Sequence, residues 1–141
     1  MMTIVTISVK IPSKRRMDAL PVKETTGLPF ASSVVMKNHL GVEMPAMHAC
    51  GHDLHMSVWL GTISTLIKLK DHWKGTIVAI GQPAEELAGG ADSMIRAGLF
   101  TRFPKPDYIL AYHVNAEMPA GTIGYCPGQI LAGVNSADIT V

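Results

Sequence analysis

Apolar side chains recur every three to four residues in the stretch that follows Asp53, and this is the clearest pattern in the chain. Polar residues occupy most of the remaining positions of that stretch. Apolar residues at this spacing line one face of an α-helix. We therefore predict a helix from Asp53 to about residues 70–71, just before Gly75. Its apolar face is formed by Met56, Trp59, Leu60, Ile63, Leu66 and Ile67.

Two short apolar runs, residues 76–80 and 107–112, predict strands. Each run is continuous rather than alternating, which is typical of strands buried on both faces. Residues 3–9 alternate β-branched residues with Thr and Ser and predict a third strand. Residues 89–97 predict a second helix, which Gly98 would end. The order strand, helix, strand, helix, strand predicts an α/β fold with a mainly parallel sheet flanked by helices.

The rest of the chain carries weaker patterns. Residues 17–46 are rich in Pro and Gly, which predicts loop with short irregular pieces. Residues 121–125 and 129–132 are predicted to be short strands, separated by a Pro-Gly pair.

The composition limits the classes of protein to consider. The chain has 141 residues, of which 48% are apolar and 16% charged, as in one globular domain. Its formal net charge of +1 provides no basic surface for nucleic acid or an anionic membrane. No apolar run approaches the ~18 residues that span a bilayer, and the start lacks the features of a signal peptide. We expect neither nucleic acid nor a membrane as a partner.

Candidate metal ligands lie before the first predicted helix and after the two apolar runs. Residues 47–55 hold three histidines, a cysteine and a carboxylate. Glu85 and Glu86 follow one predicted strand, and His113 follows the other. In open α/β folds, sites form at the carboxyl ends of the strands. We therefore expect these groups to converge at one edge of the sheet.

Thiolate, imidazole and carboxylate groups together favour a metal centre that performs hydrolysis. Cys50 and His52 could bind one or two divalent ions, and two ions could share Cys50 as a bridge. One of Glu85 and Glu86 could be a ligand while the other remains free as a general base.

Taken singly, each candidate also has a structural explanation. Cys50 could be a buried thiol beside a loop histidine, and His113 could be a core or turn histidine. Glu85 and Glu86 could be acidic residues at a helix N-terminus. The combination of all of them is much less compatible with coincidence than any one alone.

The other histidines and the second cysteine are weaker candidates. His39 and His72 lie in polar segments and are predicted to be structural. His48 and His55 could contact and orient the metal ligands without binding the metal themselves. Alternatively, His48 could lie in a turn and His55 on the helix surface. Cys126 is predicted to be a free, buried thiol rather than half of a disulfide with Cys50. A thiolate ligand at Cys50 would favour a reducing compartment, so we predict a cytoplasmic protein.

Four segments resemble, in the same order, the metal-dependent amidohydrolases and peptidases of the aminoacylase and carboxypeptidase type. The most similar branch contains hippurate hydrolases, N-acetyl-diaminopimelate deacetylases and indole-acetyl-amino-acid hydrolases. Shorter matches at residues 73–76 and 119–122 extend the resemblance from Met17 to Val141. The four segments are residues 17–24, 47–55, 82–86 and 113–114.

The resemblance implies a zinc-peptidase-like catalytic domain that binds two divalent ions, Mn or Zn, with Co also possible. Cys50 would lie between the two ions, and Glu85 would be the general base. The reaction would be hydrolysis of the amide bond of a small N-acyl amino acid by a metal-activated water. Full-length relatives would be homo-oligomeric. The remaining implied ligands are His52, Glu86 and His113.

The chain also departs from the family pattern. Arg16 stands where the family has an acidic residue, and four of the five family ligands are matched. We therefore predict an incomplete domain, with an atypical segment over 1–16, a partial catalytic domain over 17–134, and the start of a lid or dimerisation domain over 135–141. The alternative is a catalytically inactive fragment that retains only metal binding or an interaction role.

Overall fold

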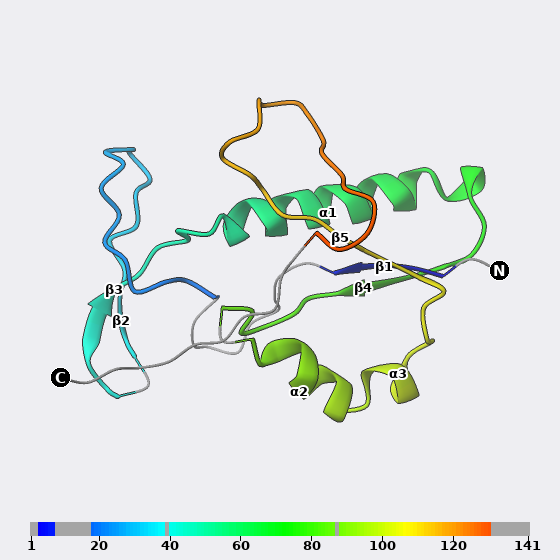
Figure 1. Cartoon of the computed structure of the whole chain (residues 1–141), viewed down its shortest axis with the longest axis horizontal. Helices are drawn as coiled ribbons and strands as arrows, with labels where there is room; N and C mark the ends of the chain where they lie inside the picture. Colours follow the sequence, from blue (N-terminus) through cyan, green and yellow to red (C-terminus); the bar gives the residue numbers. More distant parts are fainter. Residues whose placement is uncertain (1–2, 8–17, 39, 87, 131–141) are drawn as a thin grey trace.

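The central sheet has three strands, β1 (Thr3–Ile7), β4 (Thr76–Ile80) and β5 (Tyr108–Ala111), with β1 in the middle. The computed structural model describes residues 3–7, 18–38, 40–86 and 88–130. β1 pairs in parallel with both neighbours, so the carboxyl ends of all three strands meet at one edge. The segments that follow β4 and β5 therefore leave the sheet at the same edge (Figure 1).

Helices lie on both sides of these strands, with α1 (His52–Lys68) on one side and α2 (Gly90–Arg96) and α3 (Leu99–Arg102) on the other (Figure 1). The predicted α/β class and both predicted helices are confirmed. A short 3-10 helix, η1 (Lys70–His72), follows α1. No helix among the described residues is long and apolar enough to cross a membrane.

Gly98 ends α2, as its position predicts. The glycine has a φ of 91°, a left-handed conformation that costs glycine less than any other residue. A further turn of helix, α3, begins directly after it, where the sequence predicted only the end of a helix.

A small antiparallel pair lies in the region that was predicted to be loop. It consists of β2 (Val35–Lys37) and β3 (Glu43–Pro45). Asn38 shapes the connecting turn, because its side-chain oxygen accepts hydrogen bonds from the main-chain nitrogens of Leu40 (2.9 Å) and Val42 (3.0 Å). Strands of three residues are too short to show a hydrophobic alternation, which is why the sequence pattern did not reveal them.

The predicted burial of the two apolar strands is wrong. In β4 only the last residue, Ile80, is buried, and every residue of β5 is exposed. β5 lies at the edge of the sheet, and in the described part of the chain nothing covers it enough to bury it. An apolar run indicates a strand that can be buried, whereas its actual burial depends on other segments.

The two short strands predicted near the end of the described region are also absent. Residues 121–125 and 129–130 form no strand, and residues 131–132 lie outside the described residues. Ile123 is 96% exposed and Tyr125 is 87% exposed. A strand needs a neighbour for its main-chain hydrogen bonds, and no described segment pairs with this one.

Few side chains in the described residues are well shielded from solvent. The buried apolar side chains are Ala46 and Ile80, and two histidines, His52 and His55, are at least as buried. Histidine is usually only partly buried. The best-shielded part of the structure is therefore a polar cluster at the start of α1.

Candidate metal centre

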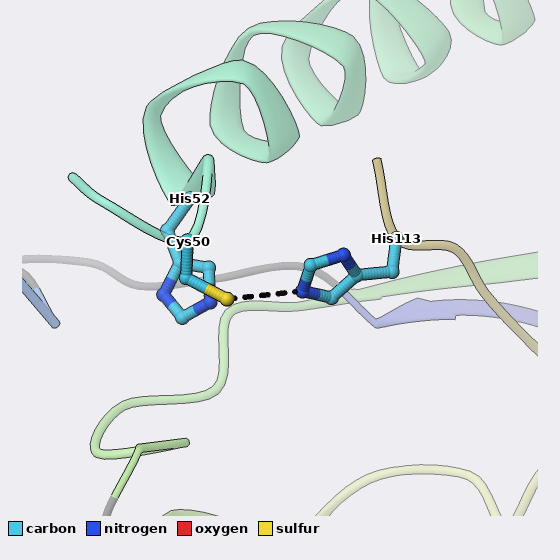
Figure 2. A group of neighbouring side chains, drawn as sticks. All are labelled: Cys50, His52 and His113. Atoms are coloured by element: carbon cyan, nitrogen blue, oxygen red, sulfur yellow. Dashed lines mark hydrogen bonds between the residues drawn. The ribbon is translucent and has the colours of Figure 1, made fainter. Parts of the chain in front are cut away.

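Three of the predicted site residues meet at the carboxyl edge of the sheet. Cys50 lies in the loop before α1, His52 is the first residue of α1, and His113 lies two residues beyond β5. Figure 2 shows the sulfur of Cys50 directed at the ring of His113, and the Sγ–Nε2 distance is 3.4 Å. One ligand atom from each residue lies within 4.8 Å of the other two. The structure thus brings together residues that are 63 positions apart.

Gly51 allows the loop before α1 to approach the segment after β5. Its φ is 73°, and a Cβ atom built on it would lie 2.5 Å from Cγ2 of Val114. Carbon atoms in ordinary contact lie about 3.5–4.0 Å apart. Only glycine fits between Cys50 and His52 without displacing Val114, the residue that follows His113.

The two glutamates lie near the Nε2 atom of His52. Nε2 of His52 lies 3.6 Å from Oε2 of Glu85 and 3.7 Å from Oε1 of Glu86. Glu85 is the more exposed of the two, with 49% of its side chain accessible, against 26% for Glu86. All the groups predicted to form the site therefore lie together, and the two carboxylates differ in their access to solvent.

Asp18 is a further member of the cluster. Its Oδ2 atom lies 3.5 Å from Nδ1 of His52 and accepts a 2.8 Å hydrogen bond from the main-chain nitrogen of Glu85. Its side chain is 5% exposed. Asp18 therefore links His52 to the segment that carries the two glutamates. The sequence indicated it only as part of the segment 17–24 and not as a member of the site.

The spacing of these atoms fits a bound divalent ion. Zinc bonds to nitrogen, oxygen and sulfur are ~2.0–2.3 Å long, so two ligands of one tetrahedral ion lie roughly 3.5 Å apart. The separations of 3.4, 3.6 and 3.7 Å match that value, and the last two are too long for good hydrogen bonds. In addition, Nδ1 of His52 is buried and has no hydrogen-bond partner among the described residues. The cluster thus has the composition and spacing of a metal centre.

The acidic surroundings of Cys50 also favour a cation. Burial raises the pKa of its thiol, and the negative charge of Glu86, followed by that of Glu85, raises it further. A thiolate is therefore disfavoured here unless a positive charge offsets these effects. A divalent ion bound between the thiol and the carboxylates would supply that charge.

A second group of possible ligands shares His52 with the first. It consists of Asp18, His52 and Glu85, whose ligand atoms also lie within 4.8 Å of one another. The two groups together provide enough donors for more than one ion. This arrangement is compatible with the two ions implied by the family resemblance.

His55 is buried inside the cluster. It is therefore not a helix-surface residue, which was one of the two positions that the sequence allowed for it. It is 3% exposed, and its Nε2 atom accepts a 3.0 Å hydrogen bond from the main-chain nitrogen of Val114. Burial lowers its pKa, and the nearby rings of His113 and His52 lower it further. Its ring centroid lies 4.4 Å from that of His113. His72, in contrast, is exposed, as is usual for a residue in a polar segment, and His39 lies outside the described residues.

The prediction for Cys126 is half right. Both cysteines are free, but Cys126 is exposed rather than buried. It lies in residues 119–130, all of which are exposed. Burial of a cysteine is a statistical tendency, and here no described segment covers this stretch.

The sequence pattern that defines peptidase family M20/M25/M40 matches residues 17–141. The chain belongs to this family. Among its relatives, the N-acetyldiaminopimelate deacetylase of Lactobacillus acidophilus is 43% identical over 124 residues. The enzyme of the same name from Exiguobacterium sibiricum is 40% identical, and the N-acetylcysteine deacetylase of Bacillus subtilis is 39% identical.

The matched region covers 88% of this M20-family chain but only 30% of each of these relatives. The chain therefore spans less than a third of the length of the curated relatives it matches. The named relatives act on N-acetyl groups, and the family is metal-dependent, in agreement with the donor cluster at the sheet edge.

Proposed function

We propose that this chain forms part of a metal-dependent amidohydrolase that removes the acyl group from a small N-acyl amino acid. The observation that carries the proposal is the meeting of a thiol, two imidazoles and two carboxylates at one sheet edge, with neighbouring donor atoms 3.4–3.7 Å apart. Such a mixed set of donors suits Zn or Mn, and Co is also possible. We propose two ions, as the family resemblance implies.

In this proposal four residues hold the ions: Cys50, His52, Glu86 and His113. The carboxylate of Asp18, 3.5 Å from Nδ1 of His52, would favour a proton on that nitrogen, which leaves Nε2 with a lone pair for the metal. Bound divalent ions would polarise the amide carbonyl and lower the pKa of a water molecule. The chain's own residues supply the remaining steps.

Glu85 is the proposed general base. Its side chain is half exposed, so it can reach both solvent and a substrate bound over the site. It would take the proton of the attacking water and pass it to the amine nitrogen as the amide bond breaks. The products are a carboxylic acid and a free amino acid. The main-chain nitrogen of Glu85 donates a hydrogen bond to Asp18, and this contact keeps the Glu85 segment close to His52.

An acetyl group is the favoured acyl group, because the named relatives are deacetylases. A benzoyl group, as in hippurate hydrolysis, is the less favoured substrate. We also propose a cytoplasmic location, because a thiolate ligand is best preserved in a reducing compartment. The division into 1–16, 17–134 and 135–141 stays a prediction, because much of the first segment, including Arg16, and all of the last lie outside the described residues.

The second candidate function is metal binding without turnover. It is favoured by one observation: the chain covers only 30% of its relatives, so groups that grip the substrate can lie in regions of those proteins that it does not match. Substrate positioning can account for ~7–11 kcal/mol of a barrier.

The test is metal-dependent release of amino acid from N-acetyl- and N-benzoyl-amino acids by the purified chain and its Glu85→Gln variant. Zinc affinity is measured on both proteins as the matched control. Turnover that disappears in the variant, with zinc affinity unchanged, supports the proposal. Turnover that is the same in both contradicts the role of Glu85. Zinc binding by a folded chain without turnover supports the second candidate.

A further inference from the structure

We propose that His55 is a positioning residue, which fixes the proposed metal ligand His113 through the main chain of Val114. The inference rests on the proposed function for the role of His113. The residues involved contact one another directly in the structure. Of these residues, His113 alone needs to touch a metal ion.

The first contact lies between α1 and the residue after His113. The main-chain nitrogen of Val114 donates a 3.0 Å hydrogen bond to Nε2 of His55. An imidazole nitrogen that accepts a hydrogen bond carries no proton, so the proton of neutral His55 lies on Nδ1. Because His55 is 3% exposed, water cannot readily replace this acceptor. Its loss would leave the Val114 nitrogen without its partner.

The second contact sets the state of His113. Nδ1 of His113 lies 2.7 Å from the carbonyl oxygen of Val114, and a carbonyl can only accept, so Nδ1 carries the proton. The lone pair of Nε2 is therefore free to face Cys50, 3.4 Å away. The hydrogen bond on one imidazole nitrogen determines which nitrogen binds the metal. Both main-chain polar groups of Val114 are thus engaged, one by His55 and the other by His113.

The third contact holds the chain on the other side of His113. The hydroxyl of Tyr112 donates a hydrogen bond to the main-chain oxygen of His55. His113 is therefore flanked by two residues that are tied to the same residue of α1. His52 lies three positions before His55 on this helix, so the two lie on neighbouring parts of one helix face. One rigid helix thus carries one proposed ligand and the anchor of another.

Three variants separate positioning from general stability. His55→Leu has a similar volume but no acceptor, whereas His55→Gln places an amide oxygen near the position of Nε2 and can accept the Val114 hydrogen bond. Trp73→Phe is the control. It removes a hydrogen bond of 2.8 Å from the indole nitrogen to the Leu66 oxygen, near the opposite end of α1 from the site.

The measurements are zinc affinity by competition with a chelator, thermal stability, and the tautomer of His55 by NMR correlations between its ring protons and nitrogens. We expect His55→Leu to weaken zinc binding ~10–100-fold, the usual effect of removing a group that orients a ligand. His55→Gln should recover most of that loss, and Trp73→Phe should bind zinc like the unmodified chain. NMR of the metal-free chain should show the proton of His55 on Nδ1.

The proposal is overturned if folded His55→Leu binds zinc as tightly as the unmodified chain, or if His55→Gln is no better than His55→Leu. A proton on Nε2 of His55 would also overturn it. If His55→Leu does not fold, the Gln variant and the NMR tautomer still decide the question. If the unmodified chain itself does not bind zinc, the proposed function fails, while the tautomer still tests the contact with Val114.

Discussion

Replacing Gly51 by alanine should disrupt the metal centre although alanine is the smallest possible side chain with a Cβ atom. An alanine held at the φ of 73° that Gly51 adopts costs about 1–2 kcal/mol. Its Cβ would lie 2.5 Å from Cγ2 of Val114, an overlap of about 1 Å relative to ordinary contact. Overpacking of this kind adds about 1–3 kcal/mol. The free energy of unfolding should therefore fall by about 2–5 kcal/mol.

The same substitution at Gly61 provides a control with the opposite sign. Gly61 lies in the interior of α1, and a Cβ there would meet nothing within 4 Å. Gly61→Ala should therefore raise the free energy of unfolding by about 0.5–1 kcal/mol. Urea denaturation of both variants measures these changes, and a zinc titration measures the site. We expect weaker zinc binding only in Gly51→Ala, because relief of the clash moves Val114 and with it His113. Equal stability and equal zinc affinity in the two variants would refute this reasoning.

Two further predictions concern the electrostatics of the site. Asp18→Asn keeps an oxygen that can accept the Glu85 main-chain hydrogen bond but removes the charge beside His52, so zinc affinity should fall ~10–100-fold. A chelator competition assay measures this, and an unchanged affinity would exclude an orienting role for Asp18. Zinc affinity should also rise with pH towards the raised pKa of the Cys50 thiol, because the thiol must lose its proton to bind the metal. Titrations over a pH series check this, and Cys50→Ser should weaken the dependence; an equal slope in that variant would contradict the assignment.

The helix and the strand that carry a clear local pattern of apolar residues were predictable from the sequence. The apolar repeat after Asp53 predicted α1 to within a few residues of its observed ends, and the apolar run over 76–80 predicted the bounds of β4. The burial of the strands was not predictable, because it depends on which other segments cover them. β5 has an apolar sequence and is nonetheless exposed throughout.

Some residues of the site were predictable from the sequence, and others were not. Cys50 and His113 have side chains typical of metal ligands, and they lie where the sheet topology brings them together. The sequence did not single out the carboxylate of Asp18, because its role arises from a contact with Glu85, 67 positions away. The importance of His55 likewise arises from Val114, 59 positions away. Contacts at such separations leave no periodic signal in one sequence, so only the folded chain shows them.

The most direct test of the proposed metal centre is X-ray absorption spectroscopy of the zinc-loaded chain and its Cys50→Ser variant. The unmodified chain should show a sulfur ligand at about 2.3 Å together with nitrogen and oxygen ligands at about 2.0–2.2 Å. The sulfur signal should disappear in Cys50→Ser, since the other cysteine, Cys126, is exposed and lies outside the donor cluster. A sulfur signal that persists in the variant, or zinc bound without sulfur in the unmodified chain, would contradict a centre built on Cys50.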